Sequence, residues 1–435
     1  MKIFFQNFGC KVNSFELEAI KQSAIADGHS EVFSPEQADA AVINTCAVTG
    51  EAARKCKNAA KSVRLHNPHC CVAVMGCFPQ AFTDESNTAD YFDVVVGSKN
   101  KGEVIGAIEK FLSDGKKISL LESFSVGDKI EPLTVSKSED RTRAVLKIED
   151  GCDMYCSYCI IPYARGHVRS KSLKDIRREA EILAENGHKE IVLVGINLCC
   201  YGKDLGLRLS DAVKAVNSID GIERIRLGSL EPEMITDDDI KEFSKCKKLC
   251  GHFHLSLQSG CDMTLKSMRR KYLTKDYLRI VNGLRATFEN CSITTDVMVG
   301  FPGETEEDFL KSLEFVKSIG FASVHVFPYS ARTGTAAAKY PDQIPAAQKR
   351  RRAEIMRKQA LLSQQDFLNS QVGTRQKVIF ERESDPEYHQ GHTENYTLVK
   401  VLRKNSKNKL HKHSFYVRIK KADSNFCIGE IEDEI

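Results

Sequence analysis

No stretch of the sequence approaches the roughly 18 consecutive apolar residues that a membrane-spanning helix needs. The first residues, Met1–Asn7, also lack the apolar core and cleavage site of a signal peptide. There is no internal repeat and no long low-complexity tract. These absences argue against an integral membrane protein or an exported one, and we expect a cytoplasmic protein without a membrane partner.

The sequence also lacks a strong charge of either sign, because 63 Lys and Arg residues face 59 Asp and Glu residues, for a net charge of +4. A balance this close identifies no partner, so the local distribution of charge matters more. Apolar residues make up 42% of the chain and charged residues 28%, which is ordinary for a globular protein and excludes a largely disordered one.

Cysteine, by contrast, is abundant, with 16 residues. A reducing cytosol disfavours structural disulfides, so metal and redox roles become more frequent explanations for clustered cysteines. Most of them should still be small buried apolar side chains. Their spacing must therefore identify the exceptions.

The 435 residues are enough for two or three domains of roughly 100–200 residues each. Apolar runs alternate with helical patterns in the first hundred residues, which predicts a doubly wound α/β domain. Short β-rich runs after residue 372 predict a small antiparallel β-barrel. The predicted divisions are an N-terminal domain over 1–112, a linker over 113–143, a central domain with a trailing helix over 144–370, and the small barrel over 371–435.

The central domain repeats a strand–helix pattern, which predicts a partial (β/α)6 barrel instead of the full eight-fold one. Helical patterns separate the strand candidates. The six strands are expected at Ala144–Ile148, Glu190–Gly195, Arg224–Gly228, His252–Leu257, Thr294–Val299 and Ser323–Phe327.

Three cysteines, Cys152, Cys156 and Cys159, directly follow the first of these strands. Three thiolates in one short loop can hold three irons of a cubane cluster and leave the fourth iron open to a small molecule. A structural zinc site normally needs four ligands, and no second Cys-x2-Cys pair lies nearby in the sequence. The spacing therefore predicts an iron–sulfur cluster.

The pattern Cys-x3-Cys-x-aromatic-Cys at the end of a first barrel strand resembles the signature of radical S-adenosylmethionine (SAM) enzymes. The resemblance implies that Cys152, Cys156 and Cys159 ligate a [4Fe–4S] cluster whose open iron binds SAM, and that Tyr158 lies near the adenine of SAM. Electron transfer in that superfamily cleaves SAM to methionine and a 5′-deoxyadenosyl radical, so an external electron donor is implied.

Polar or conformationally special residues follow the later strands, where barrel enzymes collect their ligands. Asp296 lies within an apolar strand, where a carboxylate needs partners. Period-two alternation places His252, His254 and Gln258 on one polar face of their strand. The candidate cofactor-binding residues are Tyr158, Gly195, Asn197, Ser229, Glu231, Gln258, Asp296 and Tyr329.

Cys10, Cys46 and Cys77 each follow one of the first three predicted strands of the N-terminal domain. Ligands of a doubly wound sheet bind beyond the carboxyl ends of its strands. The three cysteines could therefore converge on a second three-thiolate site.

Their surroundings, Asn7-Phe-Gly-Cys10-Lys-Val-Asn13, Asn44-Thr-Cys46 and Met75-Gly-Cys77, resemble the three motifs of the methylthiotransferase family. The likeness covers nearly the whole chain, including a C-terminal barrel similar to a TRAM domain; Asn7-Phe8 departs from the residues common there. It implies an auxiliary [4Fe–4S] cluster that carries a sulfur species, a second SAM that supplies a methyl group, and an external sulfur source. All six cysteines would then be catalytic.

Between Asn395 and Lys421 the sequence has nine basic residues and no acidic one, with Tyr396, Phe415 and Tyr416 interleaved. A basic β-barrel with aromatic side chains suits RNA backbone contact and base stacking. The candidate RNA contacts are Lys400, Arg403, Lys404, Lys407, Lys409 and Lys412.

Gly9–Asn13, Ile160–Gly166 and Ser229–Pro232 resemble the family subtype that acts on N6-threonylcarbamoyladenosine beside the tRNA anticodon. The resemblance thus implies 2-methylthiolation of that nucleoside in an anticodon stem-loop. Within the enzyme class, the alternatives are isopentenyladenosine in tRNA and an aspartate of a ribosomal protein. An alternative of another class is a non-catalytic iron–sulfur regulator that binds RNA.

Overall fold

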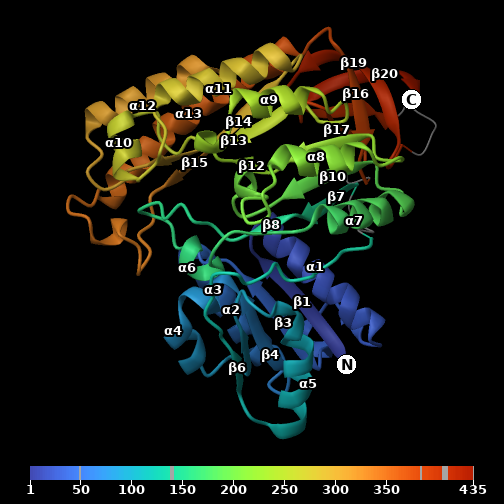
Figure 1. Cartoon of the computed structure of the whole chain (residues 1–435), viewed down its shortest axis with the longest axis vertical. Coiled ribbons are helices and arrows are strands. Elements are labelled where there is room, and N and C mark those ends of the chain that lie inside the picture. Colours follow the sequence, from blue (N-terminus) through green and yellow to red (C-terminus); the bar gives the residue numbers. More distant parts are fainter. Residues whose placement is uncertain (49, 138–141, 383–384, 404–409, 435) are drawn as a thin grey trace.

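The computed structural model describes residues 1–48, 50–137, 142–382, 385–403 and 410–434. Figure 1 shows an N-terminal α/β domain at the base, a central barrel above it and a small β-barrel at the upper right. None of the described helices is long and apolar enough to cross a membrane.

The N-terminal domain is built on a parallel sheet of order β2-β1-β3-β4-β5-β6. Helices α1 (Lys11–Ala26) and α5 (Val104–Asp114) share one apolar cluster with the sheet, and α2 (Gly50–His66) shares another. The predicted doubly wound architecture is confirmed. The strands are β1 (Lys2–Phe8), β2 (Ser30–Val32), β3 (Ala40–Thr45), β4 (Cys71–Gly76), β5 (Val94–Val96) and β6 (Ile118–Leu120).

The segment predicted as a linker, 113–143, contributes β6 to this sheet. It also returns to the domain where the Ser136 backbone N–H donates to Gln22 Oε1 over 3.0 Å. β6 could not be predicted from the sequence, because a strand of three residues with a central serine has almost no periodic pattern.

The central barrel contains all six predicted strands, and they pair in parallel. The third divides at Gly228, since β11 pairs back to β10 whereas β12 pairs forward to β13. The strands are β7 (Arg143–Lys147), β10 (Glu190–Val194), β11 (Arg224–Leu227), β12 (Ser229–Leu230), β13 (His252–Leu255), β14 (Ser292–Val299) and β15 (Ser323–Pro328).

Helices cover the outer face of these strands in one large apolar cluster (Figure 1). They are α7 (Leu173–Glu185), α8 (Leu209–Asn217), α9 (Asp237–Ser244), α10 (Asp262–Ser267), α11 (Thr274–Thr287), α12 (Glu306–Ile319) and α13 (Ala346–Ser370). On the inner face, Val12 of α1 packs against Val192 and Val194 of β10. The N-terminal domain therefore contacts the interior of the partial barrel.

The C-terminal barrel is closed, with strand order β16-β17-β18-β20-β19. The predicted small barrel is confirmed, but it is not wholly antiparallel, because β18 and β20 pair in parallel. Arg224 and Arg226 of β11 donate to the backbone carbonyls of His392 and Glu394, over 3.0 and 2.9 Å, and so join the two barrels. The strands are β16 (Arg375–Phe380), β17 (Tyr388–Thr393), β18 (Leu398–Leu402), β19 (Ser414–Ala422) and β20 (Cys427–Glu434).

Candidate active site

The three N-terminal cysteines lie at one edge of the sheet. Phe8 of β1 stands opposite Thr45 of β3, and Thr45 stands opposite Gly76 of β4. Cys10, Cys46 and Cys77 follow these aligned strand ends by one or two residues. The register therefore brings them together, as the strand order in the sequence predicted.

Two asparagines from the cysteine motifs hold these strand ends in place. Asn13 Nδ2 donates to Asn44 Oδ1 over 3.2 Å, and Asn44 Nδ2 donates to the Asn13 carbonyl over 2.7 Å. Gly76 has φ +101°, and a Cβ there would lie 2.6 Å from Asn44 Oδ1. Cys10 Sγ lies 3.1 Å from Asn13 Oδ1. The conformation of the cysteine loops thus depends on these buried amides.

Arg165 links this site to the central barrel. It ends the short helix α6 (Ile161–Arg165), is fully buried, and its Nε donates to Cys77 Sγ over 3.0 Å. Its remaining donors bond Glu16 of α1 and Asp150, over 3.1 and 3.2 Å. Burial lowers the pKa of Arg165, but the negative charges of the Glu16 and Asp150 carboxylates outweigh it and raise the pKa well above its usual value.

The second set of cysteines lies in the loop between Asp150 and α6. The Cys152 backbone N–H donates to the Gly166 carbonyl over 2.9 Å, and that of Cys159 donates to the Cys156 carbonyl over 3.0 Å. These bonds fold the loop back on itself. Ile160 and Ala164, which follow the loop, pack against Ala47 and Cys77 of the N-terminal site.

A cationic side chain lies beside this loop as well. Arg270 Nη1 donates to Cys156 Sγ over 3.5 Å, and its Nη2 pairs with Glu231 and lies 3.1 Å from Glu233 Oε2. Arg270 is 8% exposed. Each cysteine site therefore contains one buried guanidinium that touches a ligand-type sulfur.

The predicted residues Gly195 and Asn197 lie against the same loop. Asn197 Nδ2 donates to Cys152 Sγ over 3.6 Å, and its backbone N–H donates to Glu149 Oε2 over 2.8 Å. A Cβ at Gly195 would lie 2.5 Å from that Glu149 oxygen, so a larger residue there would displace the Glu149 carboxyl group. Glu149 is fully buried, and burial raises its pKa well above the usual range, so the carboxyl keeps its proton to higher pH.

Further predicted residues lie on the polar inner face of the barrel. Asp296 Oδ2 lies 3.3 Å from His254 Nε2, and the Gln258 backbone N–H donates to the Asp296 carbonyl over 2.9 Å. Ser229 of β12 stands opposite His254 in register and is exposed. The predicted alternation of β13 is confirmed, because Phe253 and Leu255 belong to the outer apolar cluster.

Tyr158 and Tyr329 belong to an apolar group beside the cysteine loop. Phe301 makes edge-on contacts with both rings, with centroid distances of 6.5 Å to Tyr158 and 5.4 Å to Tyr329. Met268 and Met298 belong to this group as well. It offers an aromatic and thioether wall such as a flat heterocycle contacts.

The side chains present fit the implied cofactors. Burial raises the pKa of the Cys46 and Cys152 thiols to about 12, so iron must displace a proton from each. Asn197 Oδ1, Gln258 Oε1 and the Tyr329 hydroxyl are buried without a hydrogen-bond partner among the described residues. Buried polar atoms are normally paired, so these three suit a polar ligand. Among the described residues, no three His, Cys, Asp or Glu side chains form a group that could hold a single metal ion. A cubane cluster does not need such a group, because each of its irons takes one thiolate.

Of the basic residues predicted to contact RNA, Lys404, Lys407 and Lys409 lie outside the described residues. Lys400 Nζ pairs with Asp385 Oδ2 over 2.9 Å, and Arg403 Nε donates to the Asp385 carbonyl over 2.9 Å. Lys412 has a left-handed backbone, with φ +66°.

The aromatic side chains of the C-terminal barrel differ from the prediction. Phe415 is 3% exposed in the barrel core, on the same inward face of β19 as Val417, so it cannot stack a base. The Arg375 guanidinium covers the Tyr416 ring at 3.6 Å. Tyr396 stacks between the rings of His252 and His392, with centroid distances of 4.8 and 4.5 Å.

Sequence reasoning missed the roles of Arg165, Arg270 and Glu149. Arg165 lies in the Ile160–Gly166 motif that indicated the subtype. The motif therefore pointed to this position, but it did not predict the contact with Cys77. Arg270 lies 114 residues along the chain from Cys156, whose sulfur it contacts, and no local sequence pattern predicts such a contact.

Comparisons with known proteins agree with this site. The profile described as "Radical SAM superfamily" matches residues 146–316, and that described as "Uncharacterized protein family UPF0004" matches residues 2–97. The radical S-adenosylmethionine methyltransferase TsrM from Kitasatospora setae, solved with cobalamin and a [4Fe–4S] cluster bound, has a TM-score of 0.57. At 11% identity over 89% of this chain and 77% of that one, this likeness shows the fold alone.

Curated relatives are similar along most of the chain. The threonylcarbamoyladenosine tRNA methylthiotransferase MtaB of Thermotoga maritima is 36% identical over 377 residues, which cover 86% of each protein. Its namesake from Bacillus subtilis is 34% identical over 100% of this chain and 98% of its own. The tRNA-2-methylthio-N(6)-dimethylallyladenosine synthase of Clostridium tetani is 35% identical over 92% and 90%.

These relatives confirm the predicted enzyme class over a non-catalytic regulator. The two matched profiles coincide with the two parts of the chain that carry the cysteine sets. The chain therefore belongs to the family of radical SAM tRNA methylthiotransferases, whose cofactors are SAM and [4Fe–4S] clusters.

Proposed function

We propose that this enzyme adds a 2-methylthio group to N6-threonylcarbamoyladenosine beside the anticodon of tRNA. One observation carries the two-site chemistry. Helix α6 begins two residues after Cys159, and its last residue, Arg165, donates a hydrogen bond to Cys77. A single helical turn thus connects the two sets of cysteines, as a transfer between two centres requires.

In this proposal Cys152, Cys156 and Cys159 hold the cluster that binds SAM. With SAM bound, such a cluster supplies a 5′-deoxyadenosyl radical able to remove hydrogen from an unactivated carbon. Asn197 and Arg270 orient the loop through their contacts with Cys152 and Cys156. Candidate contacts for SAM and substrate are Tyr158, Gly195, Asn197, Ser229, Glu231, Gln258, Asp296 and Tyr329.

Cys10, Cys46 and Cys77 hold the auxiliary cluster, which carries the sulfur, and a further SAM supplies the methyl group. Arg165 offsets the negative charge of this centre and keeps α6 against it. An external electron donor and a sulfur source complete the reaction.

The C-terminal barrel supplies the tRNA contacts in this proposal, through Lys400, Arg403, Lys404, Lys407, Lys409 and Lys412. The three predicted divisions then have separate roles. The division over 1–112 holds the auxiliary cysteines, the division over 144–370 binds SAM, and the division over 371–435 binds tRNA. Backbone phosphates give affinity, whereas the modified base is read in the site.

A second candidate substrate is isopentenyladenosine in tRNA. It is favoured by relatives such as the Clostridium tetani synthase, which is about as similar as the threonylcarbamoyladenosine enzymes.

The test uses enzyme reconstituted without oxygen and three anticodon stem-loops that differ only in the critical base. These carry threonylcarbamoyladenosine, isopentenyladenosine or adenosine. With SAM and a reductant, mass spectrometry should detect the added methylthio group on the first stem-loop alone. Conversion of the second in place of the first would transfer the assignment to the isopentenyl subtype.

A further inference from the structure

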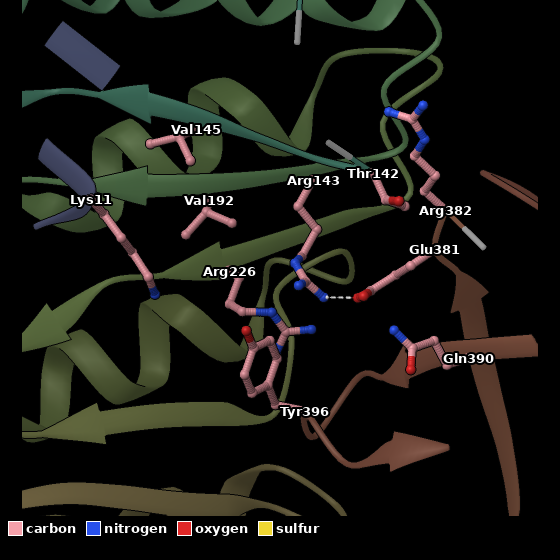
Figure 2. Close-up of a pocket in the computed structure, with 10 residues that line it drawn as sticks. All are labelled: Lys11, Thr142, Arg143, Val145, Val192, Arg226, Glu381, Arg382, Gln390 and Tyr396. Carbon is pink, nitrogen blue, oxygen red and sulfur yellow. Dashed lines mark hydrogen bonds and ion pairs between the residues drawn. The ribbon is translucent and has the colours of Figure 1, made fainter. Parts of the chain in front are cut away.

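A cavity of about 460 Å³ lies where the three parts of the chain meet (Figure 2). Lys11 enters it from the start of α1, and Arg143 and Arg226 enter from strands β7 and β11. The C-terminal barrel closes the other side. Its lining residues from that side are Glu381, Arg382, Gln390 and Tyr396.

The cavity has an excess of positive charge. Four cations line it, Lys11, Arg143, Arg226 and Arg382, against the single carboxylate of Glu381. Glu381 is already paired with Arg143 Nη1 over 2.6 Å. A concave site lined by one sign of charge attracts a ligand of the opposite sign.

Lys11 has no ion pair or hydrogen bond from its side chain to any residue within the described ranges. Figure 2 shows the side chain pointing into the cavity toward Arg226. Arg226, in contrast, is engaged, since its Nε donates to Glu190 Oε1 over 2.8 Å. Lys11 is therefore the cation most available to a ligand.

The cavity wall is pre-formed. The Tyr396 ring is fixed between His252 and His392, and the guanidinium groups of Arg226 and Arg143 lie 4.7 and 5.2 Å from its centroid. Val145 and Val192 line the opposite, apolar side. An anionic group on a short organic arm suits such a mixed site.

The position of Lys11 connects this cavity with the reaction. Lys11 directly follows Cys10, so the cavity begins one residue from the auxiliary cysteines. C2 of adenine and C6, which carries the N6 substituent, both flank N1 of the ring, so a base whose C2 faces those cysteines has its N6 substituent close beside them. The threonylcarbamoyl substituent ends in a carboxylate, whereas an isopentenyl group is uncharged.

We propose that this cavity binds the carboxylate of the threonylcarbamoyl group, with Lys11 and Arg143 as its donors. The assignment rests on the proposed function and deepens it by naming the residues that select the substrate. A carboxylate completes charge-assisted hydrogen bonds there. An uncharged substituent gives Lys11 no counter-charge and is disfavoured.

The test measures binding of three fluorescent anticodon stem-loops to the reconstituted enzyme without reductant. They carry threonylcarbamoyladenosine, its methyl ester, or unmodified adenosine. The wild-type enzyme should bind the acid on the order of tenfold more tightly than the ester, as expected for charged hydrogen bonds. Lys11→Met should bring this ratio close to one, and Lys11→Arg should retain part of it.

Lys400→Met is the matched control, because it removes a lysine of the C-terminal barrel that does not line the cavity. It should weaken all three stem-loops equally and keep the ratio. Equal binding of acid and ester by the wild-type enzyme would overturn the assignment. An equal loss for all three stem-loops in Lys11→Met would do so too, and would identify a backbone phosphate as the ligand.

These failures differ from failure of the proposed function. An enzyme that methylthiolates the threonylcarbamoyl stem-loop but binds its ester equally well keeps the function and loses the cavity assignment. An enzyme that makes no such product loses the proposed function itself.

Discussion

Three of the six cysteines at the two sites accept a hydrogen bond from a different side chain each. Arg165 touches Cys77, Arg270 touches Cys156, and Asn197 touches Cys152. Hydrogen bonds to cluster sulfurs set both the orientation and the electronic properties of such centres. The sequence predicted which cysteines gather, because strand ends are readable from apolar runs, but these three contacts are long-range.

Single replacements should separate the two sites. Cys156→Ala should lower the iron content from about eight to about four per chain and abolish SAM cleavage, because a cubane needs its thiolates. Cys46→Ala should lose a similar amount of iron, keep SAM cleavage and lose sulfur insertion. Iron analysis and detection of 5′-deoxyadenosine measure both effects. Methylthio product from Cys46→Ala would remove this cysteine from the chemistry.

Glu149 should make folding stability depend on pH. Its pKa is raised in the folded state by burial and by Asp150, so its contribution is fully present below the unfolded pKa of roughly 4.3. That contribution is lost as the pH rises through the folded pKa. Glu149→Gln keeps the shape and an acceptor without the proton equilibrium.

The melting temperature of cluster-free Glu149→Gln, relative to the wild type, should therefore increase between pH 5 and pH 9. The expected gain is at least about 2 °C, the shift that roughly 1 kcal/mol produces in domains of this size. A constant or falling difference across this range would show that Glu149 is ionised in the folded protein.

Among helices and strands, long periodic segments and uninterrupted apolar runs were predictable, whereas short strands with polar residues were not. The six barrel strands and helices such as α11 and α12 follow the apolar pattern, and Thr305 caps α12 as its spacing from Asp308 predicts. Strands β2 and β6 have three residues each and include polar side chains, so they lack the apolar run that marks the equally short β5 (Val94–Val96). The parallel pairing of β18 with β20 depends on the path of the chain around the closed barrel, and local sequence patterns do not determine that path.

The basic segment between β18 and β19 should contribute to tRNA affinity through phosphate contacts. Neutralising Lys404, Lys407 and Lys409 should weaken binding and flatten the plot of log Kd against log salt by roughly 0.7–0.9 per lost contact. Neutralising Lys110, Lys116 and Lys117, exposed residues near the end of α5 or just beyond it, is the matched control. Equal slopes for the two triple variants would exclude this segment from the RNA interface.

At the scale of the whole molecule, a buried ion network joins the N-terminal domain to the central barrel. Lys147 Nζ lies 2.7 Å from Glu16 and 2.6 Å from Asp150, and Arg165 bonds both carboxylates as well. Arg165 reaches Cys77 across 88 residues of sequence. Apolar patterning predicted two separate domains, but their shared charge network depends on the folded arrangement.

Arg165→Met should therefore affect both stability and the auxiliary site. Removing one partner from a buried ion network costs up to about 3–5 kcal/mol, because Glu16 and Asp150 lose one of their counter-charges and retain the lysine partners. We expect a lower melting temperature and loss of about four irons per chain. Arg165→Lys keeps the charge but has fewer directed donors. Its melting temperature and iron content should lie between those of the wild type and Arg165→Met. Full iron content and an unchanged melting temperature in Arg165→Met would show that the contact with Cys77 is dispensable.

Nucleoside mass spectrometry of tRNA from cells lacking this protein tests whether the enzyme adds the 2-methylthio group to N6-threonylcarbamoyladenosine. Threonylcarbamoyladenosine should accumulate while its 2-methylthio form disappears. The wild-type gene should restore the modified form, and the Cys46→Ala gene should not. Persistence of the 2-methylthio form in cells without the protein would contradict the claim, and loss of 2-methylthio-isopentenyladenosine in the same spectrum would identify the other subtype.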